Sequence, residues 1–190
     1  APRRVDVGID RERIAAVGEL GEAEGRKELD AAGRLVTPGF IDVHAHSDVA
    51  RYLNPVCETQ VGQGITTEVM GNCGYSPFPL MANNRGLLLD PPGVEVPWST
   101  AVEYFRVAGD RGAGINGVPQ VGHLTLRQAV LNGEDRPATS AEIGQMKGHV
   151  RDAMEAGARG LGSGLDYEPT TASDLDEVVD LVKVAVEYGG

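Results

Sequence analysis

The chain has 190 residues, a formal net charge of −11 and a hydrophobic content of 41%. This length and apolar content are enough to bury a sizeable core. The acidic charge argues against nucleic acid or an anionic membrane surface as a partner. No apolar run approaches the roughly 18 residues that a membrane-spanning helix needs.

The cysteines and the start of the chain bear on its cellular setting. Cys57 and Cys73 are the only two cysteines, too few for a disulfide scaffold, and they favour a reduced, cytoplasmic environment. The sequence shows no secretory signal pattern. Because it begins with Ala1 rather than Met, an earlier leader sequence stays open.

The N-terminal segment predicts a small β unit. Val5, Val7 and Ile9 alternate with other residues, which predicts a strand, and a polar turn precedes a returning strand over residues 14–17. A further short strand is expected over 35–37, directly before Pro38-Gly39. We therefore expect one domain over residues 1–36 and a second over 37–190.

The second domain is expected to alternate strands with helices. Two helix starts carry capping boxes, Thr100 with Glu103 and Thr139 with Glu142. Strands are expected over 40–46, 65–72 and 117–123, and a fourth strand with its loop over 158–167. Helices are expected from 99 onward, over 139–157 and over 173–188. A long loop over 75–97 is expected to shape or cover a site. This alternation favours βα units and a parallel sheet.

His44 and His46 follow the apolar run "GFIDV" and are candidate metal ligands. Side chains at positions i and i+2 of a strand point to the same face, so the two imidazoles could meet at one ion. Neutral imidazole suits zinc, which takes three or four protein ligands. The competing interpretation is that the spacing arises by chance and that one histidine satisfies a buried hydrogen bond.

Cys73 is the candidate third ligand. It lies in the glycine turn "MGNCGY" after a predicted strand, and a thiolate binds zinc strongly. An isolated free cysteine is more often a small buried hydrophobic residue, and Cys57 has no context that argues otherwise.

Four other residues are candidates for supporting roles. His123 is expected to end the third strand and is open to a structural or a functional role. Tyr167 follows the fourth strand and could donate a hydrogen bond to a substrate, although a lone loop tyrosine is more often structural. Asp42 is out of phase with the histidines, which favours orienting the strand over binding metal. Asp48 could accept a hydrogen bond from an imidazole as a partner behind the ligands.

Four segments together resemble one family. "VTPGFIDVHAHSD", "GQGITTEVMGNCGYSPFP", "VGHLTLRQAV" and "GARGLGSGLDYEP" occur in the order found in the N-acyl-D-amino-acid deacylase (D-aminoacylase) branch of the amidohydrolase superfamily. The resemblance implies an α/β fold in which a metal-dependent (β/α)8 barrel follows a small β-sandwich. It also implies zinc-dependent hydrolysis of N-acyl-D-amino acids to a carboxylate and a free D-amino acid.

The resemblance carries over to individual residues. His44 and His46 match the metal ligands of the first barrel strand. Cys73 matches the cysteine that replaces the bridging carboxylated lysine of other relatives, and no lysine lies between Lys147 and Lys183 in this sequence. Tyr167 matches a tyrosine of the substrate pocket.

The resemblance also indicates which metal ligands and catalytic groups of the family these 190 residues do not supply. Two further histidine ligands and the catalytic aspartate of the family would follow Gly190, so we expect no catalytic residue in this chain. The chain would then be the first four βα units of a barrel with part of a β-sandwich, inactive alone, and it would form oligomers or need the missing half. A dihydroorotase-like or hydantoinase-like amidohydrolase and a non-catalytic half-barrel are the alternatives.

Overall fold

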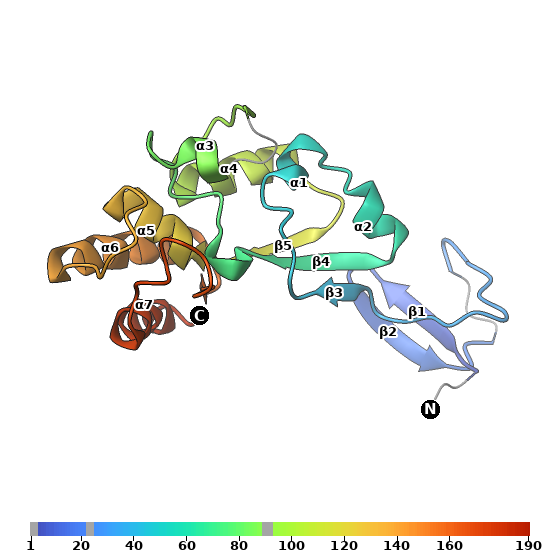
Figure 1. Cartoon of the computed structure of the whole chain (residues 1–190). Coiled ribbons are helices and arrows are strands. Elements are labelled where there is room, and N and C mark those ends of the chain that lie inside the picture. The colour runs from blue at the N-terminus through green and yellow to red at the C-terminus, as the bar shows by residue number, and fades with distance from the viewer. Residues whose placement is uncertain (1–3, 22–24, 89–92) are drawn as a thin grey trace. The chain divides into compact units, whose positions relative to one another are not determined.

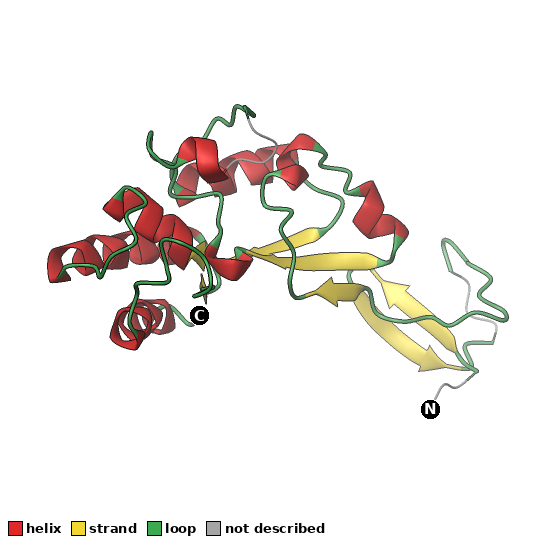
Figure 2. Ribbon diagram, viewed as in Figure 1, coloured by secondary structure: helices red, strands yellow, loops and turns green. Residues whose placement is uncertain are grey.

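The computed structural model describes residues 4–21, 25–88 and 93–190. The chain divides into two compact units, Ala1–Pro38 and Gly39–Gly190. Figure 2 shows strands and loops in the described part of the first unit, whereas the second unit combines strands with helices.

The first unit is built on an antiparallel hairpin. β1 (Asp6–Asp10) pairs with β2 (Arg13–Gly18), with an irregularity after Gly8, and this confirms the predicted hairpin. The strand predicted over residues 35–37 is wrong. Those residues are irregular and Leu35 and Val36 are exposed, because they have no ladder partner among the described residues.

The strands of the second unit are parallel. β3 (Phe40–Asp42), β4 (Ile65–Met70) and β5 (Asn116–Pro119) form one sheet in that order, and β6 (Val121–Gly122) pairs with β7 (Leu161–Gly162). Only Gln120 separates β5 from β6, and its N–H donates to the Met70 carbonyl at 3.0 Å. The strands therefore follow one another in chain order (Figure 1).

Helices connect these strands, as the prediction of βα units requires. α1 (Ala50–Leu53) and α2 (Glu58–Gly62) join β3 to β4. The 3₁₀ turn η1 (Asn72–Gly74), α3 (Arg85–Leu88) and α4 (Ala101–Arg111) lie between β4 and β5. α5 (His123–Leu131) and α6 (Ser140–Ala156) join β6 to β7, and α7 (Leu175–Glu187) follows β7.

The helices with predicted caps begin where the sequence places them. Thr100 with Glu103 and Thr139 with Glu142 both form complete capping boxes. In α7 the cap is Asp174, whose side chain accepts from the Glu177 N–H, so the helix starts two residues later than predicted. Local side-chain signals therefore located these helices well.

All four predicted strands of the second unit are shorter than expected, the second of them ending at Met70 rather than at residue 72. The first ends at Asp42, before the histidines, and the fourth is reduced to Leu161–Gly162. The third is divided at Gln120, and His123 is the first residue of α5 rather than the last of a strand. Turns and a helix take over the backbone where the parallel ladders end.

The core of the second unit lies between the helices and the strands. Its fully buried members include Phe78, Val121, Leu126, Met146 and Leu181. The predicted loop over 75–97 contributes to it, since the Trp98 indole N–H donates to the Pro77 carbonyl at 2.8 Å. Part of that prediction, residues 89–92, lies outside the described residues.

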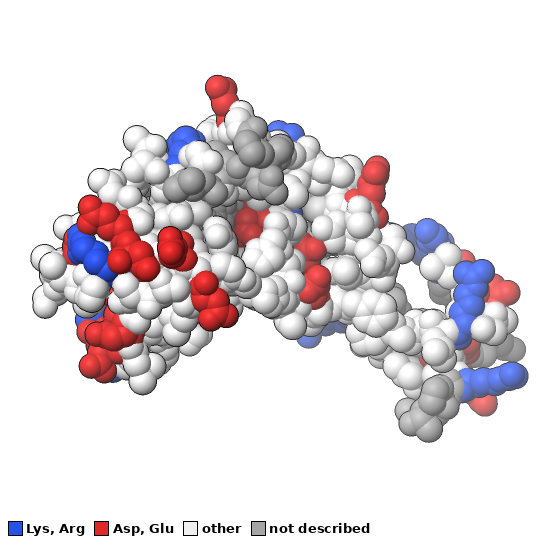
Figure 3. Space-filling view, viewed as in Figure 1, with Lys and Arg blue, Asp and Glu red and all other residues white. Residues whose placement is uncertain are grey.

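The surface is acidic over part of this unit. Acidic side chains gather over the region of α6 and α7 in the space-filling view (Figure 3). No helix among the described residues is long and apolar enough to cross a membrane.

Candidate metal centre

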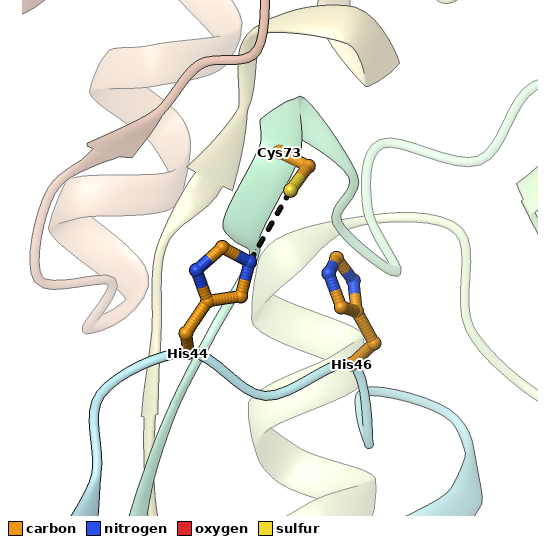
Figure 4. Close-up of side chains that lie close together, drawn as sticks. All are labelled: His44, His46 and Cys73. Atoms are coloured by element: carbon orange, nitrogen blue, oxygen red, sulfur yellow. Dashed lines mark hydrogen bonds between the residues drawn. The ribbon is translucent and has the colours of Figure 1, made fainter.

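His44, His46 and Cys73 come together at one point. One ligand atom from each residue lies within 4.8 Å of the others. His44 Nε2 is 3.3 Å from the Cys73 Sγ, and the two imidazole centroids are 5.4 Å apart. Figure 4 shows both rings rising from the segment after β3 toward the turn that carries Cys73. The structure thus places the three predicted ligands together.

Hydrogen bonds to the Asp42 side chain and to the neighbouring strand β4 fix the histidine segment. The Asp42 carboxylate accepts from the His44 N–H at 3.0 Å, and the Ala45 N–H donates to the Val69 carbonyl at 3.1 Å. Asp42 therefore holds the turn that ends β3. The rings themselves remain exposed.

Cys73 lies in a turn whose backbone conformation is unfavourable for a residue other than glycine. Its φ of 54° is left-handed, a region that residues other than glycine rarely adopt, and Gly71 and Gly74 on either side also have positive φ. The Asn72 side-chain amide donates to the carbonyls of Ala45 and Val69, which ties this turn to the histidine segment. Such strain is a feature of functional sites.

Glycines pack the turn against two other loops. A Cβ on Gly162 would lie 2.0 Å from the Gly71 carbonyl oxygen, and one on Gly122 would lie 2.2 Å from that of Gly74. A Cβ on Gly164 would lie 2.8 Å from the Cys73 carbonyl oxygen. Contacts this close leave no room for a side chain, so bare backbone sets the position of Cys73.

Asp48 supports the turn rather than an imidazole. Its carboxylate accepts from the Gly71 N–H at 3.0 Å. Burial raises the pKa of Asp48 to about 7, although hydrogen bonds from backbone N–H groups act in the opposite direction. The Tyr104 hydroxyl donates to its carbonyl oxygen at 3.3 Å.

Tyr167 stands beside Cys73. The charge of the Cys73 thiolate and a hydrogen bond with it raise the pKa of the Tyr167 phenol. The Tyr167 ring meets Tyr75 edge to face at a centroid distance of 6.1 Å. Tyr75 was not among the predicted site residues, although it follows the "NCG" turn directly.

His123 is placed away from the cluster, in a buried polar network. Its ring nitrogens contact Ser163 Oγ at 3.0 Å and Glu177 Oε1 at 2.7 Å, and none of its hydrogen bonds reaches His44, His46 or Cys73. Arg127 Nη1 pairs with both oxygens of Glu177 at 2.8 Å. Arg127 and Glu177 were not predicted from the sequence as partners, because 50 positions separate them.

The chemistry of the cluster fits zinc. Imidazole nitrogen and thiolate sulfur are zinc ligands, bound at about 2.0–2.3 Å, so two ligands of one ion lie at most roughly 4.6 Å apart. The distance of 3.3 Å between His44 Nε2 and Cys73 Sγ is within that limit. The three ligand atoms, which lie within 4.8 Å of one another, would have to move only slightly closer together to share one ion.

The family follows from comparison with known proteins. The family model described as "Amidohydrolase family" matches residues 27–188. This match spans most of the chain, so the chain belongs to the amidohydrolase family.

Particular relatives narrow the comparison to one branch. The chain is 38% identical over 182 residues to the N-acyl-D-aspartate deacylase of Alcaligenes xylosoxydans xylosoxydans, covering 94% of the chain and 36% of the relative. It is 40% identical over 192 residues to the N-acyl-D-glutamate deacylase of the same organism, covering 98% of the chain and 38% of the relative. These matches confirm the resemblance seen in the sequence.

Solved structures agree with these matches. A D-aminoacylase with a binuclear metal centre superposes with a TM-score of 0.91 at 35% identity, over 100% of this chain and 41% of that one. The N-acyl-D-glutamate deacylase of Bordetella bronchiseptica, bound to zinc and a phosphonate that mimics the tetrahedral intermediate, gives 0.85 at 39% identity. That match covers 98% of this chain and 40% of the other. The chain thus spans well under half the length of these relatives.

Proposed function

We propose that the whole protein containing this chain is a zinc-dependent N-acyl-D-amino-acid deacylase. It would hydrolyse the amide of an N-acyl-D-amino acid to a carboxylate and a free D-amino acid. The observation that carries the proposal is the meeting of His44, His46 and Cys73 within 4.8 Å of one another. The deacylase relatives at 35–40% identity support the choice of substrate class.

His44, His46 and Cys73 would hold the metal. When bound, zinc supplies a Lewis acid that polarises an amide carbonyl and lowers the pKa of water. The two imidazoles would bind through neutral nitrogens and Cys73 as a thiolate, which the strained turn between Gly71 and Gly74 presents toward them.

The neighbouring residues would orient these ligands and the substrate. Asp42 fixes the His44 backbone, and Asp48 fixes the Gly71 end of the cysteine turn. Tyr167, whose exposed ring stands beside Cys73, would hydrogen-bond the substrate. For His123, the buried contacts with Ser163 and Glu177 favour the structural role over one behind the metal ligands.

The second unit would be the first half of a (β/α)8 barrel. Parallel strands in chain order with helical connections are the pattern of that fold. The hairpin unit would be part of a small β-sandwich, with the domain boundary near residue 37. Exposed apolar residues on the outer strand β3, Phe40 and Ile41, would then be covered by the rest of the protein or by a second copy.

The 190-residue chain alone would not catalyse the reaction. The general base and the remaining ligands would come from the portion of the whole protein outside it, because the relatives are more than twice as long as the matched segment. The two free cysteines agree with a reduced, cytoplasmic setting, which stays a prediction.

The test is release of free D-amino acid from N-acetyl-D-glutamate, N-acetyl-D-aspartate and N-acetyl-D-leucine. The whole protein should act on at least one of them, lose activity on treatment with a chelator and regain it with zinc. The 190-residue chain should bind zinc and release nothing. Activity that survives complete removal of metal would contradict the proposal.

The alternatives give different results in the same assays. Hydrolysis of dihydroorotate or a hydantoin, but of no N-acyl-D-amino acid, would favour a cyclic-amide amidohydrolase. A chain that takes up no zinc, and that is unchanged by Cys73→Ala, would favour a non-catalytic half-barrel.

A further inference from the structure

A chain of hydrogen bonds joins the exposed Ser163 to three buried side chains. His123 Nδ1 lies 3.0 Å from Ser163 Oγ, and His123 Nε2 lies 2.7 Å from Glu177 Oε1. Arg127 Nη1 lies 2.8 Å from each oxygen of Glu177. His123 and Arg127 have no exposed surface and Glu177 is 2% exposed, whereas Ser163 is accessible. The proposed deacylase chemistry uses none of these four residues.

The charges in this network determine which atoms carry its protons. Burial tends to raise the pKa of Glu177, but hydrogen bonds from His123 and Arg127 outweigh it and lower that pKa, so the carboxylate is ionised. An ionised carboxylate only accepts, so His123 must carry a proton on Nε2. A second proton on Nδ1 would bury a cation beyond the one that Glu177 already neutralises in Arg127, which is costly.

His123 therefore presents a bare Nδ1 to Ser163, and the Ser163 hydroxyl donates to it. A hydroxyl within hydrogen-bond reach of a neutral imidazole, which a carboxylate orients in turn, is the arrangement of an activated nucleophile. Gly162 and Gly164 flank the serine, so its neighbours carry no side chains that would block an approaching ligand.

We infer that Ser163 is an activated nucleophile, with His123 as its base and Glu177 orienting the base. Its substrates would be activated acyl or phosphonyl compounds such as aryl esters and fluorophosphonates. The inference is independent of the proposed deacylase activity and of any metal.

The chemistry balances with water as the second reactant. Ser163 Oγ bonds to the carbonyl carbon of an aryl ester while its proton moves to His123 Nδ1. The bond to the aryl oxygen breaks, and the aryl oxide leaves with the electron pair and takes that proton. Water then cleaves the acyl-serine to a carboxylic acid and free Ser163, with His123 accepting and returning the proton. Because Arg127 shares the charge of Glu177, the imidazolium is weakly stabilised and turnover should be slow.

The first experiment is covalent labelling of the 190-residue chain with a fluorophosphonate, read by peptide mass spectrometry. A single label is expected on Ser163, at the same rate with and without a chelator. Ser163→Ala should abolish it, whereas Ser140→Ala should not, because Ser140 is an exposed serine that no histidine contacts in the described part of the chain. His123→Gln should slow labelling at least tenfold, in line with the contribution of about 10²–10⁴-fold typical of a general base. No label on Ser163, or equal labelling in His123→Gln, overturns the inference.

Because His123 is fully buried, its substitution risks unfolding, and a second measurement avoids this. Nitrogen-15 NMR of histidine-labelled chain should show His123 neutral with its proton on Nε2, and Ser163→Ala should shift its Nδ1 signal. A proton on Nδ1 overturns the base role. A deacylase assay that fails while Ser163 is still labelled would reject the proposed function and leave this inference standing.

Discussion

The two places where histidines meet other chemical groups differ in what their ring nitrogens contact. Both nitrogens of His123 have side-chain partners, the exposed Ser163 and the buried Glu177. In the exposed cluster, His44 Nε2 faces the Cys73 sulfur, and the ring of His46 makes no hydrogen bond within the described ranges. The nitrogens of His123 are thus engaged with partners inside the protein, whereas the side chains of the exposed cluster are available to a metal ion.

This contrast separates a residue type from its role. Sequence spacing makes His44, His46 and His123 similar candidates, because all three follow apolar strand-like segments. Burial and hydrogen-bond partners distinguish His123 from His44 and His46. The buried network should govern stability, and the exposed cluster should govern metal binding with little effect on the fold when no metal is bound.

Arg127→Met is the strongest test of that division. It leaves the buried Glu177 without its ion-pair partner, which typically costs about 3–5 kcal/mol of unfolding free energy. Urea unfolding should show a lower midpoint with an unchanged slope, or an unfolded chain. Glu177→Gln combined with Arg127→Met should recover part of the loss, and no recovery would mean that the pair is not the cause.

Metal should stabilise the folded chain through the exposed cluster. At zinc concentrations about 100 times the dissociation constant, linkage predicts about 2.7 kcal/mol of added stability. Cys73→Ala should abolish that gain and leave the metal-free stability close to wild type. Thermal unfolding with and without zinc measures both quantities. A zinc-induced gain that persists in Cys73→Ala would show that the ion binds elsewhere, and Cys57→Ala provides the matched cysteine control.

Cys73→Gly should separate the backbone of the turn from its sulfur. Glycine adopts the left-handed conformation of residue 73 without strain, so metal-free stability should rise by about 1 kcal/mol. Zinc binding should be lost as in Cys73→Ala. If glycine is instead less stable than alanine at this position, the strain assigned to the turn is absent.

Glu142→Gln is the smallest effect and tests an ion pair at the start of α6. Hydrogen bonds from Arg136, followed by those from Thr139, lower the pKa of Glu142 to about 2 from an ordinary value near 4.5. A lowered folded-state pKa adds stability that is fully present above pH 4.5 and is lost as the pH falls toward 2. The variant should therefore have a shallower fall in melting temperature across that window. Identical pH profiles for the two proteins would contradict the assignment.

Much of the fold was predictable because its signals are local. The capping boxes at Thr100 and Thr139 located α4 and α6 from four residues each. α5 was missed because Gly122 precedes it without a side-chain cap. The two-residue strands β6 and β7 depend on pairing across 40 positions, which no local pattern encodes.

The candidate site divides in the same way. His44 and His46 follow from an alternation of two residues, and Cys73 from the resemblance of its glycine turn to that of a known branch. The left-handed backbone of Cys73 and the packing of Gly162 and Gly164 against its turn could not be predicted, because they arise where three loops meet.

Because the three loops position residue 73 through its backbone, the side chain at this position can change which metal binds without changing the surrounding structure. Residue 73 is positioned by the close approach of its main chain to Gly164 and by the positive-φ residues Gly71 and Gly74. Aspartate tolerates the left-handed conformation better than most residues and offers an oxygen where cysteine offers sulfur. Exchange at this single position would shift the preference from soft toward harder cations while the surrounding backbone stays as it is.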